Sequence, residues 1–246
     1  MFGIFAGTLQ PWQKAIILSF WVLASFFVAQ LVVVAVFLLL ELANVTVTLN
    51  QAVLQSILAA VVYVLTLGIL IGLPWLLKGR RTSRQDVGLT GLLTWADLGL
   101  GPAGFVVYLL ASAAVVSLIG ALIPAFDASQ VQNTGFEGLS LQYEYLLAFV
   151  TLVVLAPVAE EVLFRGYLYG KLRKTTPTWI AILITSALFG LVHFQWNVGI
   201  DVFVLSVVAC VLREVTGTIW AGILLHMIKN GLAFYFLFIN TTFLVQ

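Results

Sequence analysis

The sequence is poor in charge. Only 9% of its 246 residues are Asp, Glu, Lys or Arg, against about 25% in a typical soluble domain. Apolar residues make up 62% of the chain, and its mean hydropathy is +1.13. A soluble globule of this size could not bury so much apolar surface, so most of that surface must face lipid. The net charge of +1 gives no basis for a nucleic-acid partner.

Cysteine and histidine are also scarce. Cys210 is the only cysteine, which excludes an internal disulfide and any metal site built from several cysteines. The only histidines are His193 and His226, both in the C-terminal half. We expect no cofactor.

Seven apolar stretches are long enough, or nearly so, to cross a bilayer as helices of about 20 residues. They are residues 15–40, 53–77, 102–124, 145–169, 179–194, 198–212 and 218–239. The sequence therefore predicts an all-α fold, a polytopic transmembrane helix bundle with about seven helices, eight being the alternative. Residues 1–246 are expected to form one integral membrane domain without an internal repeat or a soluble domain.

The basic residues fall in alternate loops. Lys14, the 78–84 and 171–174 segments and Arg213 carry them, whereas the intervening loops carry acids such as Asp127. Cytoplasmic loops are enriched in Lys and Arg, so the pattern predicts a cytoplasmic N-terminus. The compact chain without tails favours a prokaryotic plasma membrane. The amphipathic, glycine-containing stretch at residues 85–104 is expected to lie along the cytoplasmic interface.

Ionisable and amide side chains gather in the last four apolar stretches, where they are costly and usually mark function. This set indicates a catalytic core at residues 144–240 and consists of Glu160, Glu161, Arg165, His193, His226, Lys229 and Asn230. We assign no role to Lys229, which could point away or reach towards the interface.

The two adjacent acids predict a division of roles. Glu161 and Arg165 are four residues apart with the acid first, which is the favourable order for an ion pair on one helix face. Glu160 lies about 100° around the helix and cannot share that cation equally, and it has the apolar Phe164 four residues on. Glu161 is therefore expected to be structural and Glu160 reactive, as in other functional carboxylate pairs.

Other spacings bring further polar groups to the same depth. His226 and Asn230 share a helix face, and both side chains can donate hydrogen bonds to a developing oxyanion. Glu161 and His193 each lie sixteen residues from Pro177, so a turn there returns them to one level. The alternative is purely structural: a satisfied Glu–Arg pair, a core histidine, and interhelical bonds from His226 and Asn230.

Three motifs stand at these positions in order: EExxxR at 160–165, FxxxH at 189–193 and HxxxN at 226–230. Together they resemble the CPBP family of intramembrane glutamic endopeptidases, which includes type II CAAX prenyl endopeptidases and bacteriocin-processing enzymes. The resemblance covers about residues 144–239. It implies a helical membrane bundle whose core is the last four helices, and peptide-bond hydrolysis without a metal or cofactor.

The resemblance also implies roles for individual residues. Glu160 would be the general base that activates a water molecule, and His193 would help to hold that water. His226 and Asn230 would form the oxyanion hole, and the Glu161–Arg165 pair would orient the base and contact substrate. The substrate would be a peptide or protein, prenylated or membrane-embedded, reached within the lipid bilayer.

Three other interpretations stay open at this point. Two histidines and two glutamates could ligate zinc, although there is no HExxH motif and Arg165 would repel a cation. The second interpretation is a non-catalytic membrane scaffold or bacteriocin-immunity protein of the same family. A transporter or proton relay would also use intramembrane carboxylates. The sequence indicates neither the substrate nor the oligomeric state.

Overall fold

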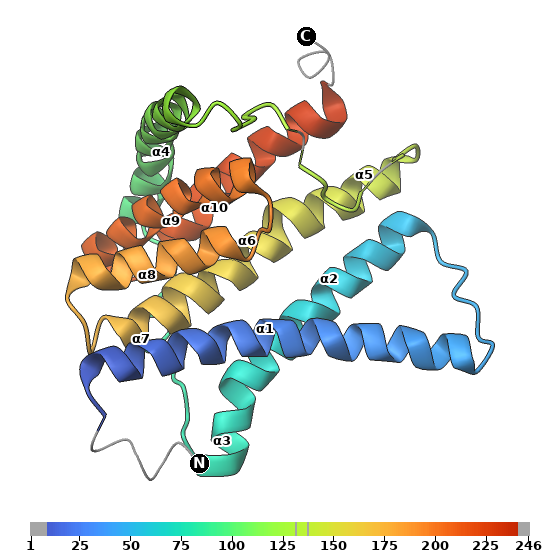
Figure 1. The fold of residues 1–246 in the computed structure, drawn as a ribbon, viewed down its shortest axis with the longest axis horizontal. Coiled ribbons are helices and arrows are strands. Elements are labelled where there is room, and N and C mark those ends of the chain that lie inside the picture. Colours follow the sequence, from blue (N-terminus) through green and yellow to red (C-terminus); the bar gives the residue numbers. More distant parts are fainter. Residues whose placement is uncertain (1–8, 131, 137, 241–246) are drawn as a thin grey trace.

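The computed structural model describes residues 9–130, 132–136 and 138–240, and every regular element within them is a helix. The elements join into seven helical segments (Figure 1). The first three are α1 (Pro11–Leu42), then α2 (Gln51–Leu67) with η1 (Gly68–Gly72) and α3 (Leu73–Lys78), then α4 (Trp95–Leu122). The fourth joins α5 (Gln142–Phe149), η2 (Val150–Leu155), α6 (Ala156–Glu160), η3 (Glu161–Tyr169) and α7 (Gly170–Leu172). The last three are α8 (Thr178–Leu191), α9 (Trp196–Thr216), and α10 (Trp220–Phe234) with η4 (Tyr235–Ile239).

The predicted all-α polytopic fold is confirmed. Five segments of the described chain are long and apolar enough to cross a membrane, whereas α8 is shorter and α9 carries several charges. Large apolar side chains on the outside, such as Phe20 at 70% and Leu31 at 66% exposure, suit a lipid surround. One boundary was wrong. The third helix was expected to begin at residue 102, but α4 begins at Trp95 and continues through Pro102. The interfacial location of this stretch stays a prediction.

Polar side chains fix where the N-terminal helices begin. The Asn50 side chain accepts a hydrogen bond from the Ala52 N–H at the start of α2. Thr94 and Asp97 form a capping box at the start of α4, and Thr218 donates to Asp97 at 3.3 Å. That last bond ties the beginning of α4 to the turn before α10.

Prolines account for two of the π-helical turns. Proline has no N–H and clashes with the carbonyl of the preceding turn, so a wider turn accommodates it. Pro74 follows η1, and Pro157 follows η2. Trp21 of α1 donates its indole N–H at 3.4 Å to the carbonyl of Leu70, which Pro74 leaves without its α-helical donor.

The C-terminal half forms the centre of the molecule. α9 contacts α4, α8 and α10, and η3 lies against α1, α8 and α9. Figure 1 shows α8, α9 and α10 running beside the α5–α7 segment, while α1 and α2 cross and splay away from them. Gly190 and Gly199 let α8 and α9 approach closely, since a side chain at residue 190 would meet the Gly199 carbonyl at 2.7 Å. The residues of η3, all of them buried except Val162, are therefore enclosed by helices.

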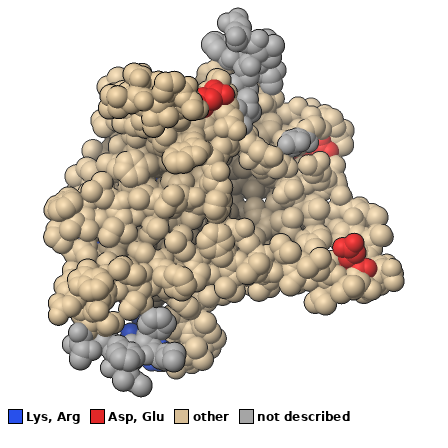
Figure 2. Space-filling model, in the orientation of Figure 1, with Lys and Arg blue, Asp and Glu red and all other residues tan. Residues whose placement is uncertain are grey.

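Charges separate towards opposite ends of the molecule. On the face in Figure 2 acids lie at the top and right, and basic residues lie at the bottom. Two basic side chains connect neighbouring segments: Lys174 pairs with Asp86 at 2.9 Å, and Arg213 of α9 donates to the Gly166 carbonyl of η3 at 2.7 Å. This grouping of Lys and Arg is what the alternating loop charges predict. The first eight residues, which the N-terminal orientation concerns, lie outside the described part.

Candidate active site

The acid pair lies where α6 becomes η3. Glu160 is the last residue of α6 and Glu161 the first of η3. Arg165 Nη1 lies 3.0 Å from Glu161 Oε1, and both side chains are completely buried. The Glu160 side chain keeps 17% of its surface exposed and has no such cation. The two acids therefore differ as their spacing predicts, one neutralised and one accessible.

The guanidinium of Arg165 is held from a second helix as well. It lies over the ring of Phe189 from α8, with 4.2 Å between Cζ and the ring centroid. A side chain at Gly222 of α10 would lie 3.0 Å from Glu161 Oε2, so glycine there gives the carboxylate its room. The pair is thus enclosed by three helical segments.

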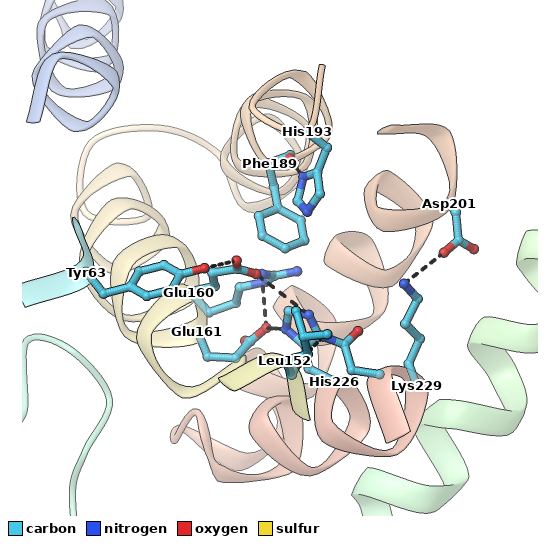
Figure 3. A network of polar contacts seen from close by, with 11 residues as sticks. Tyr63, Leu152, Glu160, Glu161, Phe189, His193, Asp201, His226 and Lys229 are labelled. Atoms are coloured by element: carbon cyan, nitrogen blue, oxygen red, sulfur yellow. Dashed lines mark hydrogen bonds and ion pairs between the residues drawn. The ribbon is translucent and has the colours of Figure 1, made fainter. Parts of the chain in front are cut away.

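His226 of α10 stands between the two acids (Figure 3). Its Nδ1 lies 3.1 Å from Glu161 Oε1, and its Nε2 lies 3.7 Å from Glu160 Oε2. A carboxylate oxygen can only accept, so Nδ1 carries the hydrogen in that contact. A neutral His226 then presents a bare Nε2 to Glu160, and only an imidazolium would donate from both nitrogens.

His193 lies just beyond the end of α8, not within it as expected, because that helix ends at Leu191 and Phe194 turns the chain with a φ of 53°. Its Nδ1 lies 2.7 Å from the Phe189 carbonyl, which again fixes the hydrogen on Nδ1 when the ring is neutral. In Figure 3 the ring points towards the layer that holds Glu160 and His226. The Phe189 ring lies edge-on to both imidazoles.

Asn230 has a partner that its motif does not suggest. Its Nδ2 donates at 2.8 Å to the carbonyl of Leu152 in η2. In η2 the Ala156 N–H bonds to the carbonyl five residues back, and the next N–H in that register would belong to Pro157, which has none. Asn230 therefore satisfies the carbonyl that this proline leaves open, and its second amide hydrogen stays available.

The sequence reasoning missed Tyr63. Its hydroxyl donates to Glu160 Oε1 at 2.5 Å from α2, ninety-seven residues away in sequence. Tyr63 is the only tyrosine in the apolar stretch 53–77. No spacing rule connects a single hydroxyl on one helix with an acid on another.

A second polar group joins α4, α9 and α10. Lys229 Nζ lies 3.4 Å from Asp201 Oδ2, and Asp201 Oδ1 accepts from Tyr108 at 2.5 Å and Ser112 at 2.7 Å. Lys229 was assigned no role, and it has this counter-ion within the bundle. The charges of Lys229 and Asp201 thus offset each other, and neither side chain hydrogen-bonds Glu160.

Within the described part of the chain, no three His, Cys, Asp or Glu side chains are arranged to hold a metal ion. One oxygen of Glu161 faces both Arg165 and His226. The face in Figure 2 is hollowed near its centre, in the region of α2 and α6, the two helices that carry Tyr63 and Glu160.

The fold defines a multi-pass helical membrane protein with a buried network of acids and histidines. Residues 142–232 match the family model described as type II CAAX prenyl endopeptidase Rce1-like. The resemblance predicted from the three motifs is thereby confirmed for this segment, which contains every predicted site residue but not Tyr63.

Three curated relatives are similar over the same proportion of the chain, about a third. An uncharacterised 24.3 kDa protein of Escherichia coli is 32% identical over 38% of this chain and 45% of its own length. The UPF0177 protein YxdF of Lactococcus lactis is 34% identical over 38% of this chain and 51% of its own length. A Bacillus subtilis protein named "Putative membrane peptidase YdiL" is 29% identical over 34% of this chain and 34% of its own length. The matched region thus spans a third to a half of each relative's length. No solved structure matches the chain.

Proposed function

We propose that the protein is an intramembrane endopeptidase in which Glu160 activates water to hydrolyse a peptide bond. The observation that carries this proposal is the asymmetry of the acid pair. Glu161 is buried against Arg165, whereas Glu160 is partly exposed and faces an imidazole. The similarity to a prenyl endopeptidase family and to a protein named as a membrane peptidase supports the same class of reaction.

In the proposed reaction Glu160 Oε2 takes a proton from a water molecule while the water oxygen attacks the carbonyl carbon of the substrate. The tetrahedral intermediate carries its negative charge on the former carbonyl oxygen. When it collapses, the C–N bond breaks and the leaving amine takes the proton from Glu160. The products are a carboxylic acid and an amine, and Glu160 is again ionised. The acid then passes its remaining proton to the amine, which gives a carboxylate and an ammonium ion.

The neighbouring groups have distinct tasks in this proposal. The bare Nε2 of neutral His193 accepts a hydrogen bond from the attacking water, which orients it. Asn230 offers its remaining amide hydrogen to the oxyanion, and His226 does so from Nε2 in its imidazolium form, in which both ring nitrogens already carry hydrogen before the water attacks. Glu161 holds Nδ1 of His226 and thereby sets the direction of Nε2.

The site lies within membrane helices, so the substrate is proposed to be a hydrophobic peptide, a prenylated peptide or a membrane-embedded protein. Grouping of the basic loops at one end supports a cytoplasmic N-terminus. The similarity to three bacterial proteins supports the plasma membrane of a prokaryote as the proposed location. We propose that residues 144–240 form the catalytic core of a single membrane domain.

The test is cleavage of matched prenylated and unprenylated peptides by the protein purified in detergent. Glu160→Gln should lower kcat at least 10³-fold, roughly the scale of losing a general base and its oriented water. Glu214→Gln is the matched control, because it makes the same change in a surface pair with Arg173 at 3.0 Å. Full activity in Glu160→Gln would refute the mechanism, as would chelator inhibition that added zinc reverses. A phenotype in cells that survives Glu160→Gln would favour the scaffold or immunity protein.

A further inference from the structure

We propose that Tyr63 of α2 is a positioning residue that orients the carboxylate of Glu160 for water activation. This inference rests on the proposed function and deepens it. It places a part of the active site in the N-terminal half, outside the residues 142–232 that match the endopeptidase family.

The two oxygens of Glu160 have different neighbours. Oε1 accepts the hydroxyl of Tyr63 at 2.5 Å, whereas Oε2 lies 3.7 Å from Nε2 of His226, beyond hydrogen-bond distance. A hydroxyl–carboxylate bond of about 2.5–2.7 Å is of the short, charge-assisted kind. Tyr63 therefore occupies Oε1 and leaves Oε2 for the water.

Glu160 needs this support because its own helix gives it none. The terminal torsion of a glutamate side chain is broad and roughly two-fold, so an unsupported carboxylate rotates. Glu161 is fixed by Arg165 and His226. Within the described residues, the hydroxyl of Tyr63 is the group that hydrogen-bonds Glu160.

The other hydroxyls of α2 near this level are occupied differently. Thr66 donates to the Val62 carbonyl within the helix. Ser56, two turns before Tyr63, donates to the Ala52 carbonyl and accepts from Thr151 of η2 at 3.0 Å. Tyr63 reaches out of α2 to the acid, and Figure 3 shows its ring lying alongside Glu160 with the hydroxyl against the carboxylate. The one long-range bond from this part of α2 to α6 thus ends on the proposed base.

A hydrogen bond to a carboxylate favours its ionised form. Removing the donor should let the protonated, inactive base persist to higher pH, so the acid limb of kcat/KM moves to higher pH. The comparison leaves the other charged or titratable groups near Glu160 unchanged. They are Glu161 and Arg165 in its own segment, His226 in α10 and His193 in the turn after α8.

The experiment compares Tyr63→Phe with Tyr108→Phe. Tyr108 is a matched control, because its hydroxyl also donates at 2.5 Å from an N-terminal helix to a membrane acid, Asp201, which makes no hydrogen bond to Glu160. Tyr63→Phe should lower kcat about 10- to 100-fold, the scale of a misplaced catalytic group, with KM within about threefold. Its acid limb should shift to higher pH, and Tyr108→Phe should change neither quantity.

A second variant guards against misfolding of Tyr63→Phe. Incorporation of 3-fluorotyrosine at position 63 keeps the shape and makes the hydroxyl a stronger donor, so the acid limb should move to lower pH. Unchanged kcat and pH profile in both variants would overturn the inference, as would equal losses in Tyr63→Phe and Tyr108→Phe. Activity in Glu160→Gln would instead remove the proposed function itself, which separates the two failures.

Discussion

Breaking the Glu161–Arg165 pair should cost far more than replacing it. Arg165→Met would leave Glu161 with no cation in a completely buried position. Breaking a buried pair by removing one partner typically costs about 3–5 kcal/mol. Arg165→Met also removes the contact of the guanidinium with the Phe189 ring, in which Cζ lies 4.2 Å from the ring centroid. Glu161→Leu alone should cost a similar amount, because it leaves the guanidinium buried and unpaired.

The double variant should recover most of the stability. Replacing a buried ion pair with apolar residues of similar volume is often neutral or stabilising. The double variant still lacks the hydrogen bond from His226 Nδ1 to Glu161, which contributes about 1 kcal/mol. If the two single costs simply added, the double variant would lose about 6–10 kcal/mol. The expected loss of about 1 kcal/mol thus leaves a coupling of several kcal/mol between the two positions.

The measurement is unfolding by SDS in mixed micelles, followed by circular dichroism, for the wild type and the three variants. Peptide cleavage is assayed in parallel, and the double variant should stay inactive because His226 has lost the group that directs it. Additive losses of stability in the double variant would refute the reasoning. So would a wild-type stability in Arg165→Met.

Two further predictions concern other contacts. Asn230→Leu should lower the free energy of unfolding by about 1–3 kcal/mol, because the Leu152 carbonyl loses its donor. Adding Pro157→Ala to Asn230→Leu should remove most of that loss, because alanine supplies an N–H in the same turn. Thermal melts of the wild type, the two single variants and the double variant would test this rescue. Lys174 donates to Asp86 and holds the pKa of that carboxyl well below its usual range, so the pair stabilises the fold above the ordinary carboxyl pKa of about 3.9. The stabilisation is lost as pH falls towards the lowered pKa. The Tm of Asp86→Asn should therefore lie below that of the wild type at pH 7 and approach it below about pH 4, and a constant difference across this range would contradict the assignment.

The sequence predicted the helices and the acid pair because both depend on local spacing. Apolar length determines the spans, and the i, i+4 relation determines that Arg165 reaches Glu161, even though η3 is a π-helical stretch. The broad grouping of His226 with the acids also follows from depth along the chain. These inferences need no knowledge of how the helices are arranged.

What the sequence could not predict depends on that arrangement. Tyr63 reaches Glu160 only because α2 lies beside α6. Lys229 has Asp201 as its partner across α9 and α10, a contact that no spacing within one helix indicates. The hydrogen bond from Asn230 depends on which carbonyl Pro157 leaves open. The roles of the six predicted site residues in catalysis stay predictions.

The position of Arg165 one turn after Glu161 has a consequence for biogenesis. A lone arginine at the centre of a helix costs about 2.5–3.5 kcal/mol to insert through the translocon. Here the counter-charge of Glu161 travels on the same helix, so Arg165 can leave the ribosome and enter the bilayer already neutralised. Asp201 and Lys229 lie on separate helices, so they neutralise each other only when α9 and α10 are both in place.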